Sequence, residues 1–148
     1  MTDDEDFLDR ISQPQWKREN VTWQGLSQHF QIGDFYVAYM GSLAVGCVAI
    51  IDYDPIFWPD MEKGASLFIH KLAVKRCASG KGVSTALLEY AKAECEKRNI
   101  SALRLDTHAL RPKLRNFYER HGFKLVDERI LHGRYPTAFY VWERDAKE

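Results

Sequence analysis

The segment from Lys71 to Ala91, KLAVKRCASGKGVSTALLEYA, contains the clearest candidate site for chemistry. It reads as a buried strand, a turn of small residues with one lysine, and an amphipathic helix. Gly80 and Gly82 carry no Cβ, so a ligand could approach their backbone closely. The first turn of a helix leaves N–H groups unpaired and carries the positive end of the helix dipole, which favours an anion. The alternative is a tight packing turn between strand and helix.

The spacing of this turn disfavours two common nucleotide sites. A P-loop needs Gly-x-x-x-x-Gly-Lys followed by Ser or Thr, but Lys81 is followed by Gly82, and Lys75 stands five positions before Gly80. A dinucleotide site needs three glycines, and the corresponding positions hold two glycines and Thr85. We therefore expect an anion other than a nucleoside triphosphate or a dinucleotide.

The charge distribution supports one locally held anion. The chain has a net charge of zero, which argues against a general nucleic-acid binder. Residues 70–124 nevertheless contain 13 Lys or Arg against 5 Asp or Glu, a local balance of +8. The three cysteines, Cys47, Cys77 and Cys95, form no CxxC pair and no cluster with histidine, so we expect neither a metal nor a disulfide framework.

The length and composition predict one soluble domain. The 148 residues are 45% hydrophobic, which fits a single domain over residues 1–148. The longest apolar run, near Val48 to Ile51, is far shorter than the roughly 20 residues of a membrane-spanning helix. The first residues are acidic and no apolar segment follows, so we expect no signal peptide and a cytoplasmic location away from membranes.

The elements that must position the turn follow from hydrophobic periodicity and turn residues. We expect a hairpin, a proline-containing loop, a strand, a helix, a strand, a second helix and a closing hairpin. Their ranges are 34–40 with 43–53, 52–64, 65–74, 82–98, 101–107, 111–122, and 123–131 with 137–144. Asn99 can take the left-handed cap of the first helix, and Gly122 closes the second. The strand–helix–strand unit predicts parallel strands with a right-handed crossover, within one mixed sheet.

Three residue sets in this order resemble the GNAT superfamily of acetyl-coenzyme A-dependent N-acetyltransferases. They are the strand end HKLAV, the turn and helix SGKGVSTALLEYA, and, after LRLDT, the helix RPKLRNFYERHGFKLV. The resemblance covers about Asp34 to Asp127 and is specific because the sets occur together. It implies an α/β (α+β) fold with a mixed, mostly antiparallel sheet, a βαβ coenzyme A-binding core and helices on both faces.

The resemblance also implies which residues would hold coenzyme A. The backbone of Leu72, Ala73 and Val74 would bond the pantetheine arm as an added strand. The turn and first helical residues would cradle the pyrophosphate: Ser79, Gly80, Lys81, Gly82, Val83, Ser84 and Thr85. This chain has Ser79 where the family has Arg or Gln, and Ser84 where it has Gly or Ala.

Further coenzyme contacts are expected on the second helix. Arg111, Arg115 and Tyr118 recur at i, i+4 and i+7, so they share a face. Arg111 stands where the family usually has Asn, and it either reaches a phosphate or stays solvated. Arg115 and Asn116 are additional candidates for contacts with the coenzyme.

The chemistry implied by the resemblance is attack of an amine on a thioester. Tyr118 matches the family tyrosine that protonates the leaving thiolate; the alternative is a packing tyrosine. A base must also remove a proton from the amine, and the candidates are His70 on the central strand and Asp106 at the end of the next one. A structural histidine is the alternative for His70.

Substrate contacts should fall outside the core motif. Trp23, Asp54, Trp58 and Tyr135 offer carboxylates and aromatic faces that suit a cationic amine. The alternative is an ordinary acidic loop anchored by a buried tryptophan.

The activity expected from the resemblance is transfer of the acetyl group of acetyl-CoA to a primary amine, either of a small molecule or of a peptide. Other readings are a coenzyme A-binding module without turnover, or transfer from another thioester or to another nucleophile. Family members usually begin with a strand and a full helix, and we expect the first strand to be missing here. The sheet edge would then be either uncovered or covered by another subunit, which would fit a homodimer.

Overall fold

The computed structural model describes residues 32–144. Within this range the chain forms two compact units, each built from two separate segments. The first unit contains residues 32–50 and 71–90, and the second contains residues 51–70 and 91–144. The single domain expected from the sequence stays a prediction. The predicted substrate residue Trp23 lies outside the described residues.

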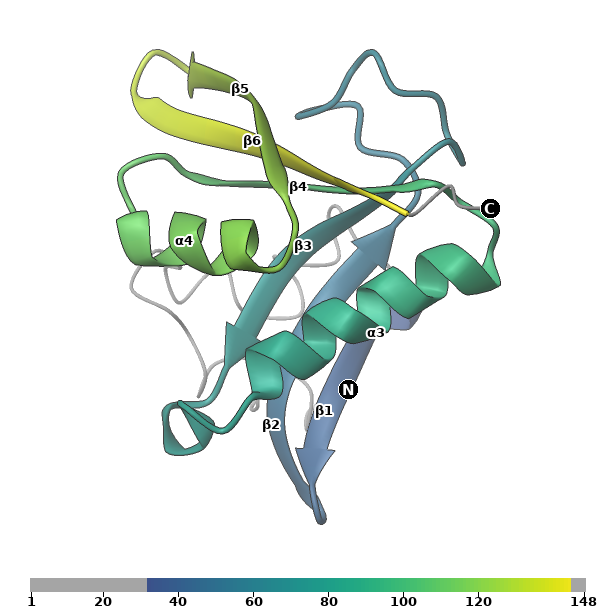
Figure 1. The fold of residues 1–148 in the computed structure, drawn as a ribbon, viewed down its shortest axis with the longest axis vertical. Helices are drawn as coiled ribbons and strands as arrows, with labels where there is room; N and C mark the ends of the chain where they lie inside the picture. The colour runs from purple at the N-terminus through teal and green to yellow at the C-terminus, as the bar shows by residue number, and fades with distance from the viewer. Residues whose placement is uncertain (1–31, 145–148) are drawn as a thin grey trace. The chain divides into compact units, whose positions relative to one another are not determined.

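The described elements follow the predicted order (Figure 1). They are η2 Ile32–Asp34, β1 Phe35–Met40, β2 Leu43–Ile51, β3 Leu67–Val74, η3 Arg76–Ala78, α3 Val83–Lys97, β4 Ala102–His108, α4 Pro112–Arg120, β5 Lys124–Leu131 and β6 Tyr135–Glu143. The sheet has six strands in the order β1-β2-β3-β4-β6-β5. β3 and β4 are parallel, whereas the ladders β1–β2, β4–β6 and β5–β6 are antiparallel. This confirms the mixed, mostly antiparallel sheet.

The two helices end in the backbone conformations that their sequences favour. Asn99 has φ 57°, and Ile100 N–H donates to the Cys95 carbonyl at 2.8 Å, which closes α3 with a Schellman motif. Gly122 has φ 90°, and Phe123 N–H donates to the Tyr118 carbonyl at 3.1 Å after α4. Both predicted helix ends are therefore confirmed. No helix in residues 32–144 is long and apolar enough to cross a membrane.

In the first unit, Gly46 lets β2 approach α3 closely. A Cβ at this position would lie 2.9 Å from Cγ1 of Val83 and 3.0 Å from the carbonyl oxygen of Ala73. It would also lie 3.2 Å from Cδ1 of Leu87. The backbone oxygen cannot move away without shifting β3, so glycine is required here by packing.

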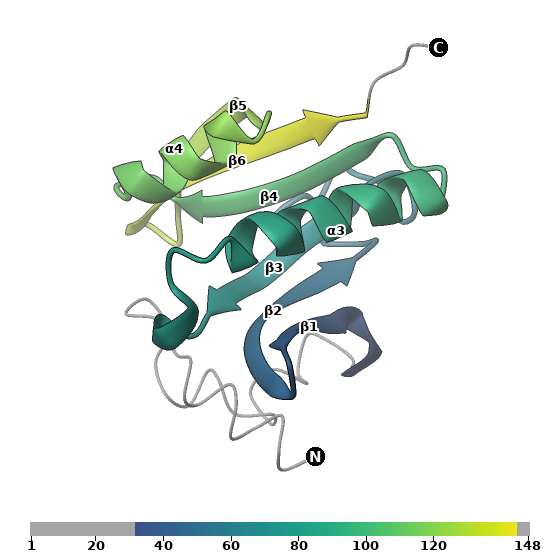
Figure 2. The same ribbon diagram turned by 60° about the horizontal axis from the view of Figure 1, so that its bottom comes forward.

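In the second unit, an aromatic cluster anchors the loop between β2 and β3. Trp58 is buried against Phe68 and Phe139, and its ring meets that of Phe139 edge to face at 5.3 Å. α4 lies alongside β4 and β6 (Figure 2). The ring of Tyr118 on α4 lies 6.5 Å from that of Tyr140 on β6. These contacts fix the loop and α4 against the sheet.

We expect Gly46→Ala to lower the free energy of unfolding by about 1–3 kcal/mol, because the added methyl overpacks the β2–α3 contact. Urea unfolding followed by circular dichroism measures this. Gly33→Ala is the matched control, since a Cβ at Gly33 would meet nothing within 4 Å. Equal stability of both variants would contradict the packing role of Gly46.

Candidate active site

β3 changes its backbone conformation just after it separates from β4. The parallel ladder runs from Leu67 opposite Leu103 to Ile69 opposite Leu105, and His70 follows directly. The next residue, Lys71, adopts a left-handed conformation with φ 55°, which is unusual for a residue with a Cβ. The alternation of side chains between the two faces of a regular strand is therefore interrupted at Lys71.

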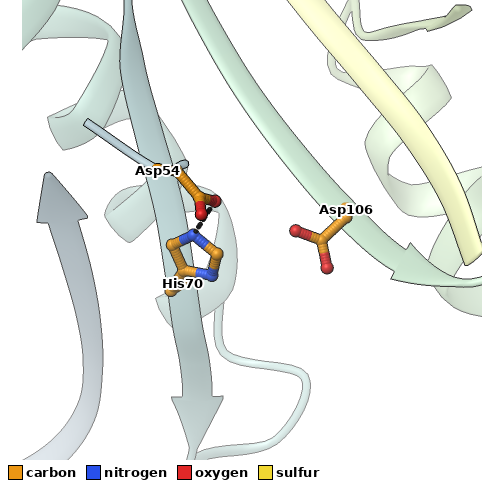
Figure 3. Close-up of side chains that lie close together, drawn as sticks. All are labelled: Asp54, His70 and Asp106. Atoms are coloured by element: carbon orange, nitrogen blue, oxygen red, sulfur yellow. Dashed lines mark hydrogen bonds and ion pairs between the residues drawn. The ribbon is translucent and has the colours of Figure 1, made fainter. Parts of the chain in front are cut away.

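His70 is held by an aspartate from the anchored loop. Its Nε2 lies 2.7 Å from Oδ2 of Asp54, and both side chains are largely buried, with 13% and 6% of their surface exposed (Figure 3). The other carboxylate oxygen of Asp54 accepts a hydrogen bond from the Phe57 N–H at 3.2 Å. Both oxygens of Asp54 are therefore engaged within the protein.

Asp106 on β4 completes a three-residue cluster. One oxygen of Asp106, one oxygen of Asp54 and a ring nitrogen of His70 all lie within 4.8 Å of one another. Figure 3 shows the Asp106 carboxylate turned toward the imidazole ring. The cluster carries two carboxylates and one imidazole, so it favours a bound cation or a proton transfer.

The geometry favours the proton transfer over a metal. Two ligands of a tetrahedral zinc ion stand about 3.3 Å apart, because each lies about 2 Å from the metal. The 2.7 Å separation between His70 and Asp54 is shorter and is that of a strong hydrogen bond. The two atoms therefore form a hydrogen bond within the protein.

Tyr118 lies in the same unit with a buried side chain. It is 6% exposed and packs edge to face against Phe117 and Phe123. Burial, and to a smaller extent the negative charge of Asp106, raise the pKa of Tyr118 well above its usual range. Tyr118 therefore keeps its proton at neutral pH. Asp106 links the tyrosine electrostatically to the His70 cluster.

Arg115, expected to contact the coenzyme, makes three hydrogen bonds within the unit. Its guanidinium donates to the Tyr140 hydroxyl at 2.9 Å, to the Ala109 carbonyl at 3.0 Å and to Glu128 at 3.0 Å. The Tyr140 hydroxyl in turn donates to Glu119 at 2.7 Å. These bonds favour a structural role that ties α4 to β6 and β5, and a coenzyme contact of Arg115 stays a prediction.

The glycine turn is open on its outer side. Gly80 and Gly82 have φ 78° and 82°, and a Cβ at either position would meet nothing within 4 Å. Unlike Gly46, these two glycines are not required by close packing, and the geometry of the turn fits a phosphate cradle. Two of its N–H groups are used internally: Ser79 donates to Arg76 and Lys81 donates to Ala78. The first turn of α3, which begins at Val83, follows directly and faces its N–H groups toward the same end of the helix.

The other predicted site residues differ in exposure. Ser79, Lys81, Asn116 and Tyr135 are exposed; Leu72, Val74, Ser84, Thr85 and Arg111 are partly buried; Ala73 and Val83 are buried. Trp58 belongs to the aromatic cluster, which favours the alternative of a buried tryptophan that anchors the loop. A direct substrate contact of Trp58 stays a prediction.

A model of the GNAT acetyltransferase domain matches residues 31–125. The chain belongs to the GNAT acetyltransferase family. The uncharacterized N-acetyltransferase YesJ of Bacillus subtilis is 26% identical over 94 residues, which are 64% of this chain and 49% of that protein. The matched part thus spans about half the length of this curated relative.

Several solved structures share the fold. A GNAT-family protein from Desulfovibrio desulfuricans superposes with a TM-score of 0.77 at 20% identity, covering 97% of this chain and 94% of that one. Ard1 from Thermoplasma volcanium gives 0.74 at 17% identity, with 97% and 93% covered. A GNAT acetyltransferase from Elizabethkingia anophelis, with acetyl-CoA bound, gives 0.67 at 15% identity, with 83% and 84% covered.

The pairing of Asp54 with His70 could not be read from the sequence of this GNAT chain. The two residues are 16 positions apart, and no helical or strand periodicity relates them. The sequence predicted Asp54 only as a substrate contact in an acidic loop. The loop's aromatic anchor was the one signal that it returns to the sheet.

We expect Asp106→Asn to lower the pKa of the Tyr118 hydroxyl, because the Asp106 charge disfavours the phenolate. The pKa should stay above the ordinary value of about 10, since burial is the larger cause. Titration of ¹³Cζ-labelled tyrosines measures it, with the Tyr118 resonance assigned by its absence in Tyr118→Phe. Asp127→Asn, which removes an exposed carboxylate on β5, should leave the titration unchanged. Identical titrations in both variants would contradict the link to Asp106.

Proposed function

We propose that this GNAT protein is an N-acetyltransferase that transfers the acetyl group of acetyl-CoA directly to a primary amine. The observation that carries the proposal is Tyr118: a buried, protonated hydroxyl beside Asp106, at the position of the family's catalytic tyrosine. The acetyl-CoA in the Elizabethkingia structure and the name of YesJ support the cosubstrate and the reaction.

Acetyl-CoA would supply an activated acetyl thioester, and the glycine turn is where this chain would hold its pyrophosphate. Gly80 and Gly82 keep the outer side of the turn open, and the first turn of α3 offers N–H groups and a positive dipole end. The exposed ammonium of Lys81 adds positive charge at the same place. In our proposal the N–H groups of Gly80 and Gly82 and of the first turn of α3 bind the pyrophosphate. The N–H groups of Ser79 and Lys81 are already used in hydrogen bonds within the turn.

Tyr118 acts as the general acid. Direct transfer leaves a thiolate that must be protonated, and the phenol holds its proton until that moment because burial disfavours the phenolate. The acceptor amine must also lose its charge before it attacks. An amine of pKa ~10.4 is neutral at pH 7 in only about one molecule in 2,500, a cost of roughly 4.6 kcal/mol, so a base is required.

The expected cytoplasmic location and homodimer stay predictions. A coenzyme A-binding module without turnover is the main competing function. Incubation with acetyl-CoA and a panel of primary amines, followed by detection of free thiol, separates the two. Thiol release that depends on the amine is expected; binding of coenzyme A without release on any amine would favour the module.

We expect Tyr118→Phe to lower turnover by about 10² while leaving coenzyme A affinity near that of the unmodified protein, because only the proton donor is lost. The ring packing against Phe117 and Phe123 is retained, so the fold should persist. Thiol release and calorimetric titration with coenzyme A measure the two quantities. Tyr39→Phe, at an exposed position, is the matched control. Unchanged turnover in Tyr118→Phe would assign the proton to another donor.

We expect Gly82→Val to weaken coenzyme A binding by at least about tenfold, because the branched side chain would cover the backbone that cradles the pyrophosphate. Gly64→Val is the matched control. Gly64 has φ 84° against 82° at Gly82, and a Cβ at either position would meet nothing within 4 Å. Both variants therefore carry the same backbone strain. If both bind coenzyme A equally well, the turn does not hold the pyrophosphate.

A further inference from the structure

The cluster of Asp54, His70 and Asp106 offers one imidazole and two carboxylates where an acceptor amine could bind and lose a proton. We infer that Asp54 is a positioning residue that fixes His70 so that Nδ1 is the base, and that Asp106 holds the ammonium group of a cationic acceptor. This inference rests on the proposed N-acetyltransferase activity. Its structural basis is the 2.7 Å contact between Asp54 and His70 and the Asp106 carboxylate on β4.

The contact between Asp54 and His70 decides which ring nitrogen can accept a proton. An ionised carboxylate only accepts hydrogen bonds, so the proton in the 2.7 Å contact belongs to Nε2 of His70. In a neutral imidazole the other nitrogen then carries the lone pair. Nδ1 is therefore the basic atom, and it lies on the side of the ring away from Asp54 (Figure 3).

Asp54 is itself held in place by two hydrogen bonds from its own loop. Its Oδ1 accepts the Phe57 N–H at 3.2 Å, and its backbone carbonyl accepts the Trp58 N–H at 2.8 Å. Trp58 in turn packs against Phe68 and Phe139 in the buried aromatic cluster. The aspartate is only 5% exposed, so it contacts His70 and has little surface left for a substrate. Its effect on the reaction must pass through the imidazole.

Asp106 suits the ammonium site better than the role of base. A neutral imidazole offers an unprotonated ring nitrogen, and histidine is the side chain that most often serves as a general base. The carboxylate of Asp106 adds a second negative charge to the cluster, which favours a cationic acceptor over a neutral one. A cation beside Asp106 would also offset the charge that raises the pKa of Tyr118, and so make that hydroxyl a better acid.

The proton and bond changes balance without any further reagent. The ammonium at Asp106 gives one proton to Nδ1 of His70, and Asp54 stabilises the imidazolium. The freed lone pair forms the N–C bond to the acetyl carbon while the C–S bond breaks. The thiolate takes the proton of Tyr118, and the second proton lost by the nitrogen restores that phenol. The imidazolium releases its proton to solvent, so one ammonium yields one amide, one thiol and one proton.

The tautomer of His70 is the direct test of the positioning role. In the full chain labelled with ¹⁵N-histidine, the His70 signals of the neutral ring should show protonated Nε2 and unprotonated Nδ1. These signals are assigned to His70 by their absence from the spectrum of His70→Gln. Asp54→Asn, which keeps the shape without the charge, should weaken this preference. A His70 protonated at Nδ1 in the unmodified protein would overturn the inference.

Kinetics separate positioning from binding. Asp54→Asn should lower kcat at least about tenfold and leave KM for the amine within about threefold, because the base is misplaced and the ammonium site is intact. Asp106→Asn should raise KM for a cationic amine at least about tenfold. Asp60→Asn, an exposed carboxylate of the same loop, is the matched control and should change neither.

A double substitution tests whether Asp54 acts through His70. The variant with both Asp54→Asn and His70→Gln should be no slower than His70→Gln alone, since the aspartate has no further role once the imidazole is gone. Additive losses would overturn the inference. So would activity that is lost on chelation with EDTA, which would favour a metal at the cluster.

The outcomes also distinguish this inference from the activity on which it rests. Amine-dependent thiol release in the unmodified protein, together with an unchanged kcat in Asp54→Asn, overturns the positioning role and leaves the N-acetyltransferase activity standing. If the unmodified protein releases no thiol with any primary amine, the activity itself is refuted and the inference falls with it.

Discussion

Burial of Trp58 is the constraint on which the candidate site depends. Its ring lies against Phe68 on β3 and Phe139 on β6, so a loop with two prolines returns to the sheet. Burial of an aromatic side chain of this size contributes roughly 1.5–3 kcal/mol, enough to hold the loop in place. Arg129 on β5 adds a hydrogen bond to the Phe57 carbonyl at 3.2 Å. The result is that Asp54 is presented to His70 at hydrogen-bond distance.

The site then combines two kinds of buried polar group. The cluster of Asp54, His70 and Asp106 is rich in negative charge, whereas Tyr118 is an uncharged hydroxyl in an apolar setting. The charge of Asp106 acts on both, since it neighbours the imidazole and raises the pKa of Tyr118. In the proposed reaction, proton acceptance and proton donation would thus be coupled through one carboxylate. In a low-dielectric setting such coupling is strong, because little water screens it.

The glycines of this chain show two different physical requirements. Gly46 is demanded by packing, because a Cβ there would collide with Val83 and with a backbone oxygen. At Gly80 and Gly82 an added Cβ would meet no neighbour, and glycine is favoured there because the backbone is left-handed. The outer side of the turn is therefore open. That difference favours a ligand cradle over a packing turn.

Local sequence determined most of the fold of this GNAT chain. The order of strands and helices, the left-handed Asn99, the end of α4 at Gly122 and the open glycine turn all follow from periodicity and turn chemistry, which act over a few residues. The same local patterns carried the family resemblance that the domain match confirmed. Only the tertiary structure decided which side chains meet. The pairing of Asp54 with His70, the burial of Trp58 and the internal bonds of Arg115 join residues that are distant in sequence. The left-handed Lys71 likewise departs from the regular strand that its sequence predicts. Such contacts depend on how whole elements pack, and periodicity within one element contains no information about its neighbours.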